Sequence, residues 1–154
     1  MKNLPSTRVF NIADPPNKHR LMRESLSALE PNPDLGFVAI HLVAAFIDGL
    51  ASGPAGGTRD AYLEYLRHNF PDMCRAIGAE MFYSHIRNKA VHEFAVLPPF
   101  GLAHSNDLSD PSAHTESRLI DGKQWILINV ERVLADFRSH LDSLDQAGNG
   151  KAGT

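Results

Sequence analysis

Arg87, Asn88 and His92 are the residues whose types and spacing best suit chemistry on a phosphate ester. They form the pattern Arg-Asn-x-x-x-His within a predicted helix. An arginine offers up to about five N–H donors in a planar fork that fits phosphate oxygens, and a histidine exchanges protons near neutral pH. On an ideal helix Asn88 and His92 share a face, whereas Arg87 lies about 140° from His92. For the two groups to meet, the arginine must therefore reach around the helix, or the last turn must unwind.

The helices that position this motif are predicted from apolar periodicity and from start signals. Asp14, Asn32, Thr58 and Asn129 can each cap a helix. Prolines directly follow Asp14 and Asn32, and Pro71 opens the fourth helix. The predicted helices are 15–30, 35–50, 59–70, a long helix from Pro71 through the motif, and a last helix to about Leu144. Gly78 falls within the long helix, where a close helix crossing would explain it.

A small β-hairpin is predicted before the last helix. Asp121-Gly122 lies between two short apolar stretches within Ser117–Ile128, which is a strong hairpin signal. Leu102–His104 can add a third short strand. Between them lies a loop rich in serine, aspartate and proline, in which His104 and His114 are expected to be solvated.

The predicted fold is therefore mostly α, an up-and-down bundle of about five helices with a small hairpin before the last helix. We expect residues 1–14 to form an N-terminal arm, residues 15–145 to form a single domain, and residues 146–154 to be a disordered tail.

The predicted second helix is almost entirely apolar, which suits a central position in the core. His41, Asp48 and Ser52 form a polar stripe on it. One interpretation is that this stripe faces solvent. The other is that Asp48 accepts a hydrogen bond from Arg87 or Arg59, because a carboxylate is rarely buried without a partner.

Composition excludes several classes of protein. The net charge of −3 does not suit a broad basic surface for sequence-independent nucleic-acid binding. A single cysteine, Cys74, provides neither a disulfide framework nor a thiolate metal site, and it suits a reducing, cytoplasmic compartment. The longest apolar run, Phe37–Ile47, is shorter than the ~18 residues expected of a membrane span, and no secretory signal is visible.

A helical chain with Arg87, Asn88 and His92 late in a long helix resembles the HEPN superfamily. Its members carry an arginine, commonly followed by a polar residue, and a histidine four to six positions after the arginine. The surrounding Phe82-Tyr83 and the apolar segment 46–51 are similar to compact members of this group. The resemblance covers roughly residues 33–144. Phe94 stands where some toxin members carry a tyrosine that is modified, so that form of regulation is not expected.

The resemblance implies metal-independent RNA cleavage without a cofactor, at a site that two copies of the motif form across a homodimer. His92 would act as general base or acid, Arg87 would stabilise charge on the phosphate, and Asn88 would orient the phosphate or the histidine. Tyr83 and Lys89 would contact the substrate, and Asp48 would support the site. A cognate antitoxin or other partner protein is a further expectation. Tyr83 also suits a core position with its hydroxyl at the rim, and Lys89, like Arg67 and Arg75, also suits a plain surface charge.

Two other functions are compatible with the sequence. Eight histidines prompt a metal site, but the Glu-x-x-His pairs of metal-binding bundles are absent. The second alternative is a non-catalytic dimeric module that binds a nucleotide or a protein. A basic cleft around Arg87 would favour RNA, and a closed apolar groove would favour a protein or small ligand.

Overall fold

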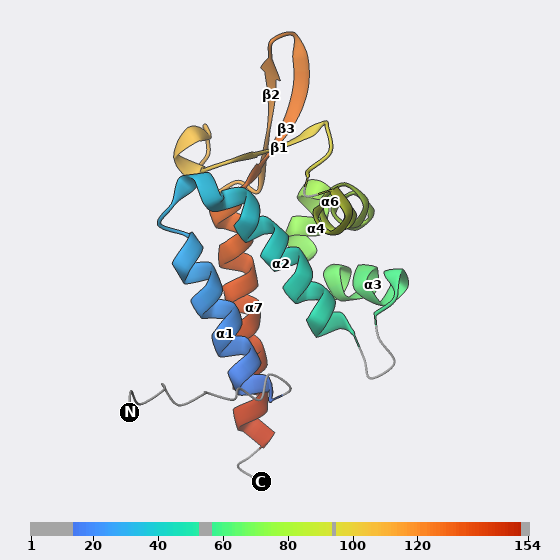
Figure 1. Ribbon diagram of the computed structural model, residues 1–154, viewed down its shortest axis with the longest axis vertical. Helices are drawn as coiled ribbons and strands as arrows, with labels where there is room; N and C mark the ends of the chain where they lie inside the picture. The colour runs from blue at the N-terminus through green and yellow to red at the C-terminus, as the bar shows by residue number, and fades with distance from the viewer. Residues whose placement is uncertain (1–13, 53–56, 94, 152–154) are drawn as a thin grey trace, which may run out of the picture.

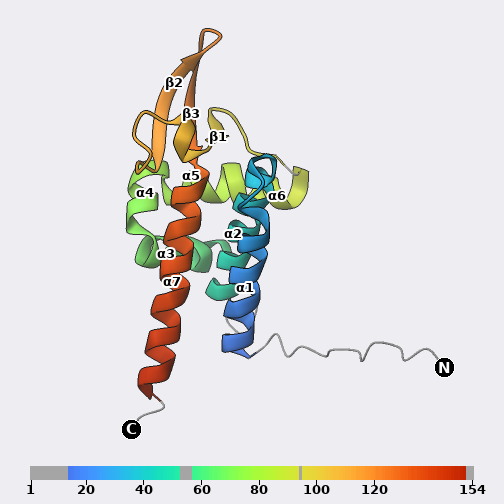
Figure 2. The same cartoon turned by 90° about the vertical axis from the view of Figure 1, so that its left-hand side faces the viewer.

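The computed structural model describes residues 14–52, 57–93 and 95–151 of the 154-residue chain. It is mostly helical, with a small three-stranded sheet before the last helix (Figures 1 and 2). The helices and strands are α1 (Pro15–Leu29), η1 (Pro33–Leu35), α2 (Gly36–Ala51), α3 (Arg59–Asn69), α4 (Pro71–Ile77), α5 (Ala79–Met81), η2 (Phe82–Arg87), α6 (Asn88–Glu93), β1 (Phe100–Ala103), η3 (Ser105–Asp107), β2 (Thr115–Ile120), β3 (Lys123–Asn129) and α7 (Val130–Lys151).

Three of the predicted caps hold their helices through side-chain hydrogen bonds. Asn32 accepts from the Asp34 amide at 3.0 Å, and Thr58 accepts from the Ala61 amide at 3.1 Å. Asn129 accepts from the amide three residues later at 3.2 Å. Each bond satisfies one of the N–H groups that a helix start leaves without an intrahelical partner. Asp14 precedes α1 but makes no such side-chain bond, so the prolines alone mark that start.

Helix α2 occupies the centre of the fold, as its composition predicted. Its residues Ile40, Val43 and Ile47 are fully buried and lie in one apolar core with Phe137 and Leu141 of α7. Within the described residues, Pro33–Ala51 is also the one helical stretch long and apolar enough, by length and composition, to cross a membrane. A buried core helix meets the same criteria, and α2 packs against α1, α3 and α7.

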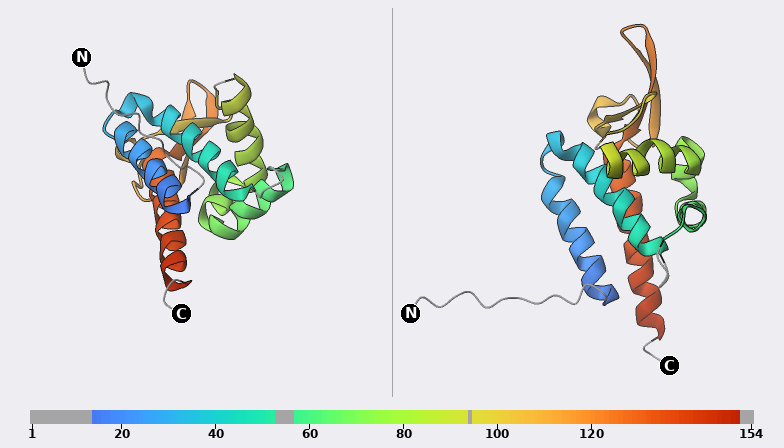
Figure 3. Two further views of the ribbon diagram at one scale, coloured as in Figure 1. Left: turned by 60° about the horizontal axis from the view of Figure 1, so that its bottom comes forward. Right: turned by 45° about the vertical axis from the view of Figure 1, so that its right-hand side comes forward.

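The helices do not all share one direction. In Figure 1, α1 and α7 run roughly vertically while α6 is seen nearly end-on. Figure 3 shows the segment that carries the motif crossing α2 at the level where the sheet begins. The motif therefore lies across the central helix, where side chains of α2 and α3 can reach it.

The predicted hairpin is confirmed. β2 and β3 pair in antiparallel register, with Ile120 opposite Lys123 and the two-residue turn Asp121-Gly122 between them. Both turn residues have positive φ, 50° and 74°, as a type I′ turn requires. β1 pairs parallel to β3 and supplies the third strand, so the order is β1-β3-β2. The hairpin projects away from the helices (Figures 1 and 3).

The single long helix predicted from Pro71 through the motif is wrong, because Gly78 interrupts it. Gly78 has φ 90° and ψ 130°, a conformation outside the helical region that an L side chain rarely adopts. The glycine is thus required by the backbone and not by a close helix crossing. The chain changes direction there, and a new helical segment starts that leads to Arg87.

Substitution of Gly78 by alanine is expected to lower the free energy of unfolding by about 1–3 kcal/mol, because alanine is strained at this positive φ. Gly148 is the matched control, since it lies inside α7 with no neighbour within 4 Å of an added Cβ. Gly148→Ala is expected to raise stability by up to about 1 kcal/mol. Urea unfolding of both variants measures the difference, and equal effects would contradict this reading of the Gly78 backbone.

The last helix is longer than predicted, since α7 continues to Lys151 instead of ending near Leu144. Residues 146–151 are therefore helical and not a disordered tail. Contacts with α1 hold the turns just before these residues: Asp145 pairs with His19 at 2.7 Å and with Arg23 at 2.7 Å, and Asp142 pairs with Arg23 at 2.8 Å. The N-terminal arm falls on residues 1–13, which lie outside the described residues, as do Phe94 and residues 152–154.

His104 and His114 are paired, so the expectation that both are solvated is wrong. The two ring nitrogens of His104 donate to Glu131 and to the Pro33 carbonyl, both at 2.8 Å. His114 pairs with Asp136 at 2.6 Å. These acceptors lie in distant parts of the chain, so the local sequence of the loop gave no sign of them.

The His104–Glu131 pair predicts a pH-dependent contribution to stability. The hydrogen bond with Glu131 raises the pKa of His104, so the contribution is complete below about pH 6.5 and is lost as pH rises through the folded-state pKa. His104→Gln is therefore expected to reduce the free energy of unfolding more at about pH 5.5 than at about pH 9. Denaturant titrations of wild type and variant at both values measure this, and a pH-independent deficit would contradict it.

Candidate phosphate-ester site on η2 and α6

Arg87 ends a π-helical segment. In η2 the hydrogen bonds span five residues, and the Asn88 amide still bonds to the Tyr83 carbonyl. Such wide turns are uncommon and occur frequently at functional sites. The following α6 is an ordinary helix through Glu93, so the chain does not unwind between Arg87 and His92.

The guanidinium of Arg87 is fixed by hydrogen bonds to two side chains. Nη2 donates to Asp48 Oδ2 of α2 at 2.5 Å, and Nη1 donates to Asn88 Oδ1 at 2.9 Å. The Arg87 side chain is 21% exposed and that of Asp48 is 30% exposed. Burial opposes the charged form, but the bond and the charge of Asp48 outweigh it and raise the pKa of Arg87. Arg87 is therefore a permanent cation in a fixed position.

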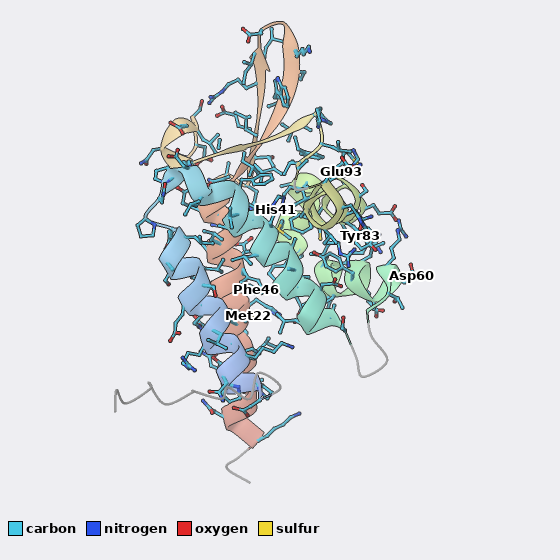
Figure 4. The ribbon with its side chains drawn as sticks, viewed as in Figure 1. Met22, His41, Phe46, Asp60, Tyr83 and Glu93 are labelled. Atoms are coloured by element: carbon cyan, nitrogen blue, oxygen red, sulfur yellow. The ribbon has the colours of Figure 1, made fainter. Side chains whose placement is uncertain are left out.

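Two tyrosines form the walls of this position. The Arg87 Cζ atom lies 5.3 Å from the ring centre of Tyr83 and 5.9 Å from that of Tyr62, within the range of cation–π attraction. Arg59 approaches Tyr83 in the same way, at 5.8 Å, and donates to Glu80 at 2.9 Å. Figure 4 shows Tyr83 on the side of the molecule where η2 faces α3. Tyr83 thus lies at the site and contacts the arginine.

Tyr62 of α3 also belongs to the site, although it lies outside the Arg-Asn-x-x-x-His motif. It is fully buried, and its hydroxyl donates to the Ala44 carbonyl at 3.0 Å. Burial, together with the negative charge of Asp48, raises its pKa well above the ordinary value. The periodicity of α3 predicted that Tyr62 faces inward, but no local signal shows that the group above its ring is Arg87.

The polar stripe on α2 does not form a solvent face. Asp48 makes the predicted contact with Arg87, and the Ser52 hydroxyl donates to the Asp48 carbonyl at 2.6 Å. His41 is buried, with Nε2 at 3.4 Å from the Ala95 carbonyl, and burial lowers its pKa. This edge of α2 therefore faces the helical segment that carries the motif and the residues that follow it.

His92 lies apart from this arginine pocket. It is exposed at the end of α6, and no hydrogen bond or ion pair involves its side chain within residues 14–52, 57–93 and 95–151. Arg87 is directed toward Asp48 on α2, and no contact links its guanidinium to His92. One chain thus presents a fixed cation and an accessible imidazole on the same short helical segment, but it does not join them.

The other cationic side chains considered for the site form ion pairs with carboxylates. Lys89 pairs with Glu93 one turn later, Arg67 lies 3.5 Å from Glu80, and Arg75 pairs with Asp72. The described residues therefore form ion pairs at these positions and not a continuous basic cleft. They also contain no group of three or more histidine, cysteine, aspartate or glutamate residues that could hold a metal ion.

No family model matches the chain, and neither a curated protein nor a solved structure matches it.

Proposed function

We propose that the chain is a metal-independent endoribonuclease of the HEPN type. The observation that carries the proposal is the fixed position of Arg87, which is held by Asp48, by Asn88 and by two tyrosine rings, five positions before an exposed His92. A preorganised cation of this kind stabilises charge that develops on a phosphate without first having to be ordered. The two bonds also leave an N–H on each terminal nitrogen, which a phosphate can use.

The proposed reaction is attack by the ribose 2′-oxygen on the adjacent phosphorus. His92 removes the 2′-hydroxyl proton, the new bond from O2′ to phosphorus forms, and the bond from phosphorus to O5′ breaks. The departing O5′ takes a proton from the protonated histidine or from water, so the upstream fragment ends in a 2′,3′-cyclic phosphate and the downstream fragment begins with a 5′-hydroxyl. Arg87 balances the charge on the non-bridging oxygens, Asn88 orients the phosphate, and Tyr83 and Lys89 contact the RNA. The nucleophile belongs to the substrate, so this route needs no metal-bound water.

A homodimer is part of the proposal, because the cation and the imidazole of one chain do not meet. Two copies that face each other through α6 would bring His92 of one chain toward Arg87 of the other. Val91, next to His92, is 61% exposed, so this face of α6 is accessible to a second copy. The up-and-down bundle, cytoplasmic location and an antitoxin or other partner protein belong to the same proposal.

The test is cleavage of a labelled mixed-sequence RNA in excess EDTA by wild type and by Arg87→Ala, at matched folding and dimer content. We expect cleavage by the wild type, with 2′,3′-cyclic phosphate ends, and its loss in the variant. Arg75→Ala is the control, since Arg75 is an exposed arginine outside the motif. Cleavage that survives in Arg87→Ala would refute the site, and 3′-hydroxyl products would refute the mechanism.

The alternative is a non-catalytic dimeric module that binds a nucleotide or a protein. The ion pairs that occupy Lys89, Arg67 and Arg75 favour it, because they reduce the positive potential available to a long RNA. Failure of the wild type to cleave varied RNA substrates, combined with nucleotide binding that depends on Arg87, would support this alternative.

A further inference from the structure

The outer edge of strand β2 is open along the projecting hairpin. The strand order β1-β3-β2 leaves β2 with a neighbour on one side only. In a hairpin with a two-residue turn, the residues that close the turn exchange hydrogen bonds, so Ile120 faces Lys123 of β3. At the other end of the ladder, the Asn129 amide donates to the His114 carbonyl at 2.8 Å. Both observations give the same phase, that is, the same alternation along β2 between residues that bond to β3 and residues that do not.

This phase determines which backbone groups face outward. Positions 114, 116, 118 and 120 bond to β3, so the N–H and C=O groups of Thr115, Ser117 and Leu119 point to the open edge. No backbone hydrogen bond outside the sheet involves these three residues within the described part of the chain. An open row of this kind is a template for another strand.

The side chains along this edge match a second copy of the same strand. If two β2 strands run antiparallel about a two-fold axis at Ser117, then Ser117 faces the partner's Ser117 and Thr115 faces the partner's Leu119. All three outward-facing residues then oppose outward-facing residues, so the backbone bonds are in register. The same axis places Glu116 opposite the partner's Arg118, and Arg118 opposite the partner's Glu116.

The charges and exposures along the edge agree with this pairing. Within one chain Arg118 already donates to Glu116 at 2.9 Å, so the partner would extend one ion pair into four alternating charges. Opposite charges directly across a strand pair are stabilising, and like charges are destabilising. Leu119 is 67% exposed and would be covered by the partner's Thr115. A register shifted by one residue would mismatch the outward-facing backbone groups. A register shifted by two residues would place Glu116 opposite the partner's Glu116, or Arg118 opposite the partner's Arg118.

We propose that two copies of the chain associate through their β2 edges, forming a continuous six-stranded sheet centred on Ser117. The two outer strands of that sheet are the β1 strands, and β3 lies between β1 and β2 in each copy. This inference goes beyond the proposed ribonuclease, because the β2 contact is a second interface, separate from the contact through α6. It rests on the hairpin alone, which lies apart from Arg87, and it holds whether or not the chain cleaves RNA.

A disulfide test locates the axis. In a Cys74→Ser background, Ser117→Cys places two sulfurs on the two-fold axis, where the Cα atoms of facing residues are about 5.5 Å apart and suit a disulfide. Leu119→Cys is the control, because the two Leu119 Cα atoms would be roughly 15 Å apart, beyond disulfide reach. Under mild oxidation we expect a covalent dimer from Ser117→Cys and not from Leu119→Cys. Equal yields, or none from Ser117→Cys, would overturn the proposal.

A charge test measures the association without a covalent bond. Glu116→Arg gives a strand with two arginines, and Arg118→Glu gives a strand with two glutamates. Each variant alone is expected to self-associate at least tenfold more weakly than wild type, whereas an equimolar mixture of the two is expected to form a heterodimer. Sedimentation velocity without RNA measures both. If the mixture were no more associated than its components, the proposal would be overturned. The β2 edge would then face solvent or pair with a strand of another protein.

Discussion

His92→Ala is expected to lower metal-independent RNA cleavage by about 10²–10⁴-fold, the usual contribution of a group that transfers a proton in the transition state. The free energy of unfolding is expected to stay within about 0.5 kcal/mol of wild type, because the His92 side chain is exposed and makes no hydrogen bond within the described residues. Initial rates on one labelled RNA, together with urea unfolding, measure the two effects separately.

The matched control for this experiment is His68→Ala. His68 is another exposed histidine, near the end of α3, and it is not part of the motif. The His68→Ala variant should cleave RNA at the wild-type rate. Equal loss of cleavage in both variants would show that His92 has no special role, and loss of stability in His92→Ala would show a structural role that the geometry does not include.

Tyr62→Ala is expected to lower the free energy of unfolding by about 3–5 kcal/mol, since it removes a fully buried ring and leaves a cavity. It also removes one of the two aromatic faces next to Arg87 and the donor to the Ala44 carbonyl. RNA cleavage should fall further than the fraction of unfolded chain explains, because Arg87 loses part of the wall that fixes it. Denaturant midpoints and rates on folded protein measure these effects.

Tyr62→Phe separates the ring from the hydroxyl. It keeps the face beneath Arg87 and removes only the hydrogen bond, so the expected loss of stability is about 1 kcal/mol and cleavage should change little. If Tyr62→Phe were as damaging to cleavage as Tyr62→Ala, the hydroxyl and not the aromatic face would be the important group, and the role assigned to the ring would be wrong.

The parts of the fold that depend on short-range signals were predictable. Thr58 and Asn129 cap the helices they were expected to cap, and Asp121-Gly122 forms the expected turn, because each signal acts within about three residues. The end of α7 was not predictable from such signals. Residues after Leu144 contain glycines, and the contacts of Asp145 with α1 lie more than a hundred positions away in sequence.

In the candidate site, too, some features were predictable from simple rules and others depended on packing between helices. A carboxylate on an apolar helix requires a partner, and this general rule was enough to anticipate the contact of Asp48 with Arg87. The break at Gly78 looked like an ordinary helical glycine, because its φ depends on how the following segment packs. The π turns of η2 and the position of Tyr62 under the guanidinium likewise result from packing between helices, which no periodicity records.

The packing of α1 against α7 has a consequence for synthesis on the ribosome. Met22 and Leu26 of α1 are buried in the core, and Arg23 and His19 pair with acids near the end of α7. Chains emerge N-terminus first at about 5–20 residues per second. For several seconds, therefore, α1 and the apolar α2 are outside the exit tunnel before the helix that covers them has been made. During that interval the nascent chain exposes apolar surface, which makes it a substrate for chaperones that bind such surface.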